Sequence, residues 1–218
     1  MPKTKRPEWL VPAGLIALSL IPVAAGAVRV FWLASGVEVT PDNARFFASP
    51  VPVVIHIFSV TIYCLLGAFQ FHPGLRRRRP KWHRTAGRIV IPAGLVAAAS
   101  GLWMSQFYQL PAHDGELLYL FRLIFGFGML LSIILGLAAI LRRDIARHQA
   151  WMMRGYAIAV GAGTQAFTLI PWILIAGEPS EFPRALLMGA GWVINLAVAE
   201  WFIRRRRSSY LIRTPAIA

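Results

Sequence analysis

The chain has 218 residues, of which 57% are hydrophobic and only 15% are charged. So few polar residues could not cover the surface of a soluble globule of this length, so the composition indicates an integral membrane protein with the lipid bilayer as its partner. The formal net charge is +14. Its basic residues are clustered in short turns between apolar runs, which is typical of membrane orientation and argues against nucleic-acid binding.

Six apolar segments follow one another along the chain. They are 11–33, 51–71, 89–107, 117–141, 155–175 and 185–203. Each is near or above the roughly 20 residues that a helix needs to cross the hydrocarbon core. The segments lack the alternation of a membrane β-barrel, so their backbone groups must be satisfied within helices. We therefore predict an all-α fold, a six-helix transmembrane bundle in which residues 1–218 form a single integral membrane domain.

The first apolar segment follows a basic N-terminus, as the apolar part of a cleavable signal peptide does. It continues to Leu33, however, and is long enough to span the membrane. We therefore predict that it is kept as an uncleaved first helix.

Lysine and arginine are distributed unevenly among the turns. Almost all of them lie in the N-terminal residues, the 72–88 turn, the 142–154 turn and the C-terminal tail. The exceptions are Arg29, Arg45, Arg122 and Arg184. Because cytoplasmic loops carry such an excess, both termini are predicted to be cytoplasmic.

Three histidines are expected near the cytoplasmic ends of the helices. Pro80 suits a first helical position and Asp144 suits an N-cap, so His83 and His148 should lie on the first turns of the third and fifth helices. His72 closes the second helix at a similar level. The three side chains are therefore predicted to reach the cytoplasmic interface at comparable depth.

These histidines suggest a cofactor site. A neutral imidazole is a good ligand for iron or zinc, and nearby arginines favour the uncharged ring because they oppose another positive charge. Arg84, Arg88 and Arg154 would be available to pair with haem propionates. The alternative is that His83 and His148 are interfacial residues that contact lipid phosphates from basic turns.

A second polar set lies in the outer third of the predicted bundle. His56 is the histidine inside an apolar run, and Arg29 and Arg122 lie at a similar level in the first and fourth segments. Ionisable residues inside membrane spans are costly and often functional. The three could bind an anionic headgroup or a propionate. Alternatively, His56 is a neutral residue bonded to a neighbouring helix, and the arginines reach outward to acidic residues of the loops.

The chain resembles a bacterial membrane family known as domain of unknown function 2306. The resemblance covers roughly residues 50–175, and Gly155-Tyr156 departs from the Ser-Tyr expected after its last motif. It rests on His56, Gly67-Ala68-Phe69-Gln70-Phe71, His83-Arg84-Thr85-Ala86-Gly87-Arg88 and His148-Gln149-Ala150-Trp151-Met152-Met153-Arg154. It implies a multi-pass protein of the bacterial inner membrane and no particular activity.

A more distant topological resemblance is to the transmembrane di-haem cytochromes b, which carry electrons from ascorbate. In them the second and fourth helices supply an outer ligand pair and the third and fifth an inner pair. His56 matches the outer ligand of the second helix, and His83 and His148 match the inner pair. The fourth helix has no histidine, and Arg122 stands near the level expected for one.

Three functional hypotheses follow. The leading one is a b-type haem protein of electron transfer, with His83 and His148 as axial ligands and a redox protein or a quinone as its partner. The second is a non-redox protein that binds or moves a small anion, using Arg29, His56 and Arg122. The third is a structural or assembly factor without a small-molecule site.

Overall fold

A computed structural model describes residues 8–111 and 113–211, and every regular element among them is a helix. The predicted all-α fold is confirmed, with six helical spans long and apolar enough to cross a membrane. The long helices are α1 (Leu10–Ser35), α3 (Pro50–Ala68), α5 (Pro80–Phe107), α6 (Glu116–Leu141), α7 (Ile145–Ala159), α8 (Gly161–Ala176) and α9 (Glu181–Leu211). The short ones are α2 (Ala44–Ala48), the 3-10 helix η1 (Phe69–Phe71) and α4 (Pro73–Arg78). The predicted cytoplasmic location of the termini falls largely on residues outside the described ranges.

Two helix starts were predicted from their first residues. Pro80 begins α5, where the missing N–H of proline would have no intrahelical partner in any case. The side chain of Asp144 caps α7, accepting a hydrogen bond from the backbone N–H of Arg147 at 2.9 Å. His83 and His148 therefore lie on the first turns of their helices, as predicted.

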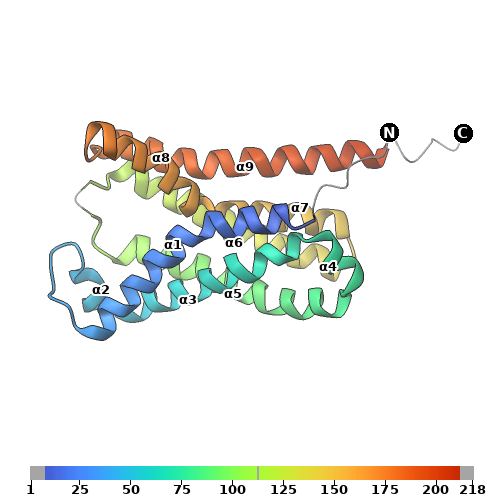
Figure 1. The fold of residues 1–218 in the computed structure, drawn as a ribbon, viewed down its shortest axis with the longest axis horizontal. Helices are drawn as coiled ribbons and strands as arrows, with labels where there is room; N and C mark the ends of the chain where they lie inside the picture. Colours follow the sequence, from blue (N-terminus) through green and yellow to red (C-terminus); the bar gives the residue numbers. More distant parts are fainter. Residues whose placement is uncertain (1–7, 112, 212–218) are drawn as a thin grey trace, which may run out of the picture.

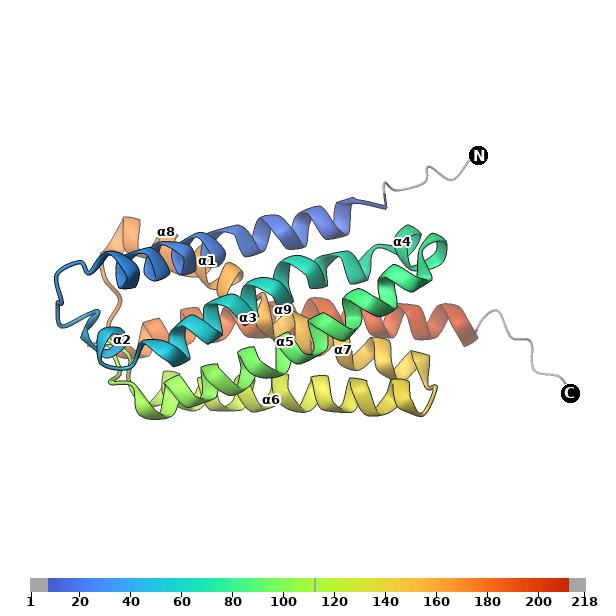
Figure 2. The ribbon, with the colours of Figure 1, turned by 90° about the horizontal axis from the view of Figure 1, so that it is seen from below.

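The helices pack into one closed bundle (Figures 1 and 2). α3 packs on α1 and α5, α6 on α5 and α7, and α9 on α7 and α8. The bundle closes because α8 also contacts α1. We name its two ends by their short helices: the α4 end, where the chain enters α1 and leaves α9, and the α2 end, with the loop before α6 (Figure 1).

Aromatic side chains fill the core of the α4 half. Tyr63 is completely buried, and Tyr156 is 4% exposed. The Tyr156 hydroxyl donates a 2.6 Å hydrogen bond to the carbonyl of Cys64, a free and buried thiol. The glycines at 67 and 94 make room for these rings, because a Cβ at either would lie within 2.7 Å of a tyrosine carbon. Small residues on α3 and α5 therefore serve ring packing here.

The fifth span differs from the continuous helix that its apolar pattern predicts. It is broken at Val160 into α7 and α8. α7 packs beside α6, whereas α8 lies beside α1 and α9, so the span crosses the bundle obliquely (Figure 2). A close approach at Gly163 accompanies the break: an added Cβ would lie only 1.9 Å from the carbonyl oxygen of Leu18 in α1.

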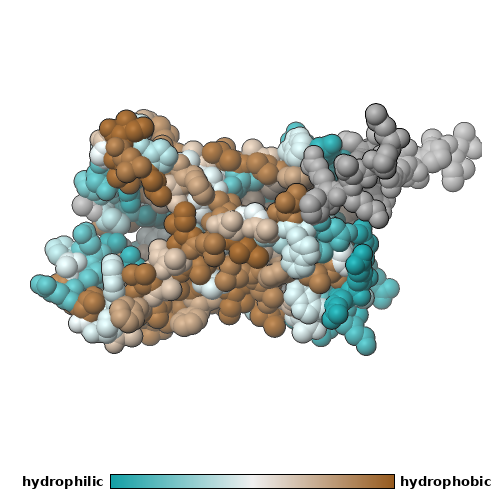
Figure 3. Space-filling model, in the orientation of Figure 1, coloured by the Kyte–Doolittle hydropathy of each residue, from teal (hydrophilic) through white to brown (hydrophobic). Residues whose placement is uncertain are grey.

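The surface has the pattern of a membrane-spanning bundle. Apolar residues form a band across the middle of the face in Figure 3, and hydrophilic residues lie at both ends. Many large apolar side chains are exposed, among them Phe58, Phe127 and Leu174. So large an exposed apolar area is stable against lipid chains but not against water.

Labelling of single cysteines tests the predicted orientation. In intact bacteria, an impermeant maleimide should label His113→Cys at the α2 end, and should label Arg142→Cys at the α4 end only after lysis. Both positions are exposed, and the native Cys64 is buried, so it need not be removed. Labelling of Arg142→Cys in intact cells with His113→Cys protected would reverse the predicted orientation.

Candidate functional site

The described residues place polar side chains inside the bundle in two regions. The predicted histidines lie at the α4 end, and His56 and several half-buried arginines lie toward the α2 end. The tyrosine-filled core lies between them. Each region is built from several helices, so neither is a contiguous motif in the sequence.

His148 is oriented by the backbone of α6. Its Nδ1 lies 2.9 Å from the carbonyl oxygen of Gly136. A carbonyl can only accept, so Nδ1 must carry the proton and donate, which leaves Nε2 with a free lone pair. Gly136 permits this contact, since a Cβ there would lie 2.8 Å from the sulfur of Met152 in α7. A ring nitrogen held in this way is the usual arrangement of a metal-binding histidine.

His83 approaches His148 from α5. The two rings are close enough to interact electrostatically, and Arg76 and Arg84 also lie within range of His83. The Nδ1 atom of His83 is buried and has no hydrogen-bond partner among the described residues. A buried polar nitrogen without a partner is unfavourable and calls for a physical explanation. The structure thus places both histidines at the α4 end, within electrostatic range of each other.

Gln70 is a residue of this region that sequence reasoning missed. Its Nε2 is also buried and without a partner among the described residues. Its Oε1 lies 3.7 Å from where a Cβ on Gly87 would be, and Gly87 is one helical turn beyond His83 on the same face of α5. The sequence offered one signal for Gln70, because it is the polar residue in the otherwise apolar Gly67–Phe71 motif.

His72 does not join the pair but caps α4. Its Nδ1 accepts a hydrogen bond from the backbone N–H of Leu75 at 3.0 Å, and its ring lies edge-on to Trp9 at 4.3 Å between centroids. It is buried, as a residue that joins α1 to α4 should be. This contact gives His72 a structural role.

The three predicted arginines have different surroundings. Arg84 and Arg88 are exposed on α5. Arg154 forms a bidentate ion pair with Glu200 of α9, with Nε 2.5 Å from one carboxylate oxygen and a second nitrogen 3.1 Å from the other. It also stacks over Trp151. The ion pair joins α7 to α9.

His56 lies on α3 and contacts α5. Its Nδ1 is 3.0 Å from the carbonyl oxygen of Ala97 and 3.1 Å from the hydroxyl of Ser100. The ring therefore bonds to a neighbouring helix, as one of the two alternatives for this residue states. It also lines a cavity of about 340 Å³ in the middle of the bundle.

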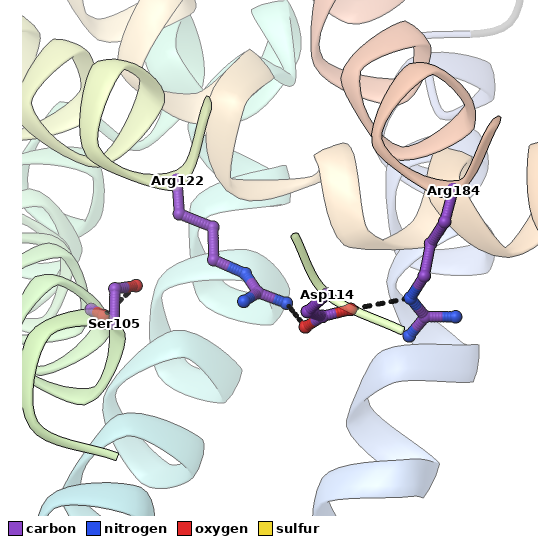
Figure 4. A network of polar contacts seen from close by, with 5 residues as sticks. Ser105, Asp114, Arg122 and Arg184 are labelled. Carbon is purple, nitrogen blue, oxygen red and sulfur yellow. Dashed lines mark hydrogen bonds and ion pairs between the residues drawn. The ribbon is translucent and has the colours of Figure 1, made fainter. Parts of the chain in front are cut away.

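Arg122 and Arg29 have separate partners. Arg122 forms an ion pair with Asp114, whose side chain is fully enclosed, and Arg184 binds the other carboxylate oxygen at 2.6 Å (Figure 4). Arg29 instead lies over the ring of Phe46, 4.0 Å from its centroid. The outward reach of Arg122 to an acidic loop residue is thus confirmed. Asp114 and Arg184 are 70 residues apart in the chain. No local pattern in the sequence therefore predicts that Asp114 also binds Arg184.

A second cavity adjoins the first at the α2 end. Its volume is about 220 Å³, and Arg45, Tyr108 and Gln109 contribute polar groups to its lining. The two cavities share several lining residues, including Ser105 and Arg122. The larger cavity has mainly apolar walls, so the polarity of the lining falls from the α2 end toward the centre.

Partial burial shifts the pKa of Arg45, one of the two arginines that line this second cavity. It lowers the pKa of Arg45 from its ordinary value, and the nearby carboxylates of Asp114 and Asp42 oppose that shift. Burial also raises the pKa of Tyr108. A guanidinium remains protonated even so. Arg45 therefore adds a positive charge to a cavity that already contains Arg122.

The fold and these two regions define a multi-pass helical membrane protein with polar sites inside its bundle. The chain belongs to the family described as predicted membrane protein (DUF2306), whose model matches residues 53–203. The match runs beyond the stretch that carried the resemblance, into α9, and begins in α3. No curated protein and no solved structure matches the chain.

Proposed function

We propose that the chain is a membrane electron-transfer protein that holds one b-type haem between His83 and His148 at the α4 end. The observation that supports this proposal is the electrostatic proximity of the two histidines at the α4 end. His148 has its tautomer set by the Gly136 carbonyl, and His83 has a buried ring nitrogen without a partner among the described residues. When bound, haem supplies a one-electron couple that the side chains of the chain lack.

Two features of this region suit haem: histidine nitrogens that could bind the iron, and arginines that could pair with the propionates. The hydrogen bond to Gly136 would leave Nε2 of His148 to bind the haem iron and would increase its basicity. Arg84 and Arg76 lie near His83 and would be available to neutralise propionates, as would Arg88 one turn further along α5. The ion pair of Arg154 with Glu200 gives that arginine the role of holding α7 in place.

An absorption spectrum tests the proposal. Protein purified after expression with ample haem should show a Soret band that shifts on reduction with dithionite. His83→Ala and His148→Ala should each abolish that band, because each removes one of the two side chains that would hold the haem. His113→Ala, an exposed histidine at the other end, is the matched control and should leave it unchanged.

The redox-independent alternatives predict another outcome. A colourless wild-type protein, or His83→Ala and His148→Ala variants with an unchanged reduced-minus-oxidised spectrum, would contradict the haem proposal. His72→Ala should retain the band, but with a lower melting temperature, because His72 caps α4.

A further inference from the structure

The two adjoining cavities toward the α2 end have no part in the haem proposal. We propose that they form a binding site for an amphipathic carboxylate, with its head between Arg45 and Arg122 and its apolar body in the central cavity. The inference is independent of the histidine pair.

The first argument is an excess of positive charge. Asp114 is one carboxylate shared by two guanidinium groups, those of Arg122 and Arg184. Arg45 lines the same outer cavity as Arg122, and its guanidinium stacks on Phe46 at 4.6 Å. Because Asp42 also lies near Arg45, three guanidinium groups are set against two carboxylates in this partly buried place. The remaining positive charge would stabilise an anionic group.

The second argument is the shape of the space. The two cavities share Ser105 and Arg122 in their linings, so one continues into the other. The charged residues therefore lie at the α2 end of the combined space. Beyond that end the walls are mainly apolar, with Val60, Phe125 and Met129 among them, although His56 and Gln165 also line them. Ligand pockets commonly combine apolar walls with a few oriented polar groups. A charged head with an apolar body matches this order.

The size of the central cavity limits the body. An engineered cavity of about 150 Å³ holds benzene, and the central cavity has about 340 Å³. It would thus accommodate a chain of roughly ten carbons or a small fused ring, whereas the two chains of a bilayer phospholipid are too large. A free acid of medium length is therefore the expected ligand.

Trp192 provides a direct probe because it lines the central cavity and stacks on Phe125 at 4.7 Å. Protein in lipid nanodiscs would be titrated with 10-bromodecanoic acid, since bromine quenches tryptophan fluorescence on contact. Trp192→Phe identifies the share of the signal that comes from this residue among the 8 tryptophans. We expect saturable quenching of that share by the acid, and competition by unlabelled decanoate.

Two variants separate the head from the body. Arg45→Gln should raise the half-quenching concentration about tenfold, because it removes a charged partner of the head. Val60→Phe should fill part of the central cavity and weaken quenching by the acid, without adding a tryptophan to the signal. Arg147→Gln, an exposed arginine at the α4 end, is the matched control for overall charge. Melting temperatures close to the wild-type value would show that each variant is folded.

Two further titrations distinguish recognition of the carboxylate from other causes of quenching. Equal quenching by 10-bromodecan-1-ol would show partition into apolar space without recognition of a carboxylate and would overturn the proposal. Quenching by phospholipids with brominated chains, without competition by decanoate, would assign the space to bilayer lipid and overturn it too. None of these fluorescence results depends on the Soret band. A failure of the carboxylate proposal can therefore be distinguished from a failure of the haem proposal.

Discussion

Replacing Asp114 with alanine should lower the free energy of unfolding by about 3 kcal/mol, as expected when one partner of a buried ion pair is removed. The carboxylate is fully enclosed, and the side chains of Arg122 and Arg184 are each only 22% exposed. Without it, two guanidinium groups would remain close together in a site with little water. Denaturation of the purified protein in detergent, followed by circular dichroism, measures the loss.

Two comparisons make this result specific. Asp114→Asn keeps the shape and should lose most of the same free energy, because the charge is what two arginines require. Glu8→Ala removes an ion pair with Arg77 that is much more exposed, and should change stability by less than about 1 kcal/mol. Equal stability of Asp114→Ala and wild-type protein would mean that water already solvates both arginines.

Gly163→Ala should destabilise the fold by about 3 kcal/mol, the upper part of the usual range for overpacking. The added Cβ would lie 1.9 Å from the carbonyl oxygen of Leu18. That atom is backbone, so no side chain can rotate away, and α1 and α8 must separate. The melting temperature of the purified variant measures this effect.

Gly14→Ala is the matched control in the partner helix. A Cβ at Gly14 would have no atom within 4 Å, and alanine is the better helix former, so stability should stay the same or rise slightly. Similar melting temperatures for the two variants would contradict the close approach of α1 and α8 at Gly163.

The spans and the placement of the histidines followed from the sequence because local signals determine them. Apolar length predicts each crossing. Pro80 and Asp144 determine where α5 and α7 begin, and hence the positions of His83 and His148 on their first turns. These features depend on residues within one turn of each other, which is the range that helix-start signals cover.

Features that depend on contacts between distant segments did not follow. The break at Val160 lies far from Pro171, the proline of this span, and it accompanies the close packing of Gly163 on α1. Asp114 looked like an ordinary loop acid, yet it is enclosed because α9 brings Arg184 to it. Long-range pairs of this kind leave no periodic pattern in the chain.

The interrupted fifth span also bears on which bilayers suit the protein. Its two halves together cover 32 residues, which as one straight helix would extend about 48 Å, well beyond a hydrocarbon core of about 30 Å. A rigid rod of that length would have to tilt as a whole. With the interruption at Val160, α8 can change its inclination while α7 stays against α6. Changes in acyl-chain length should therefore be absorbed by α8, the half of this span toward the α2 end, and α7, which carries His148, should keep its depth as membrane thickness varies.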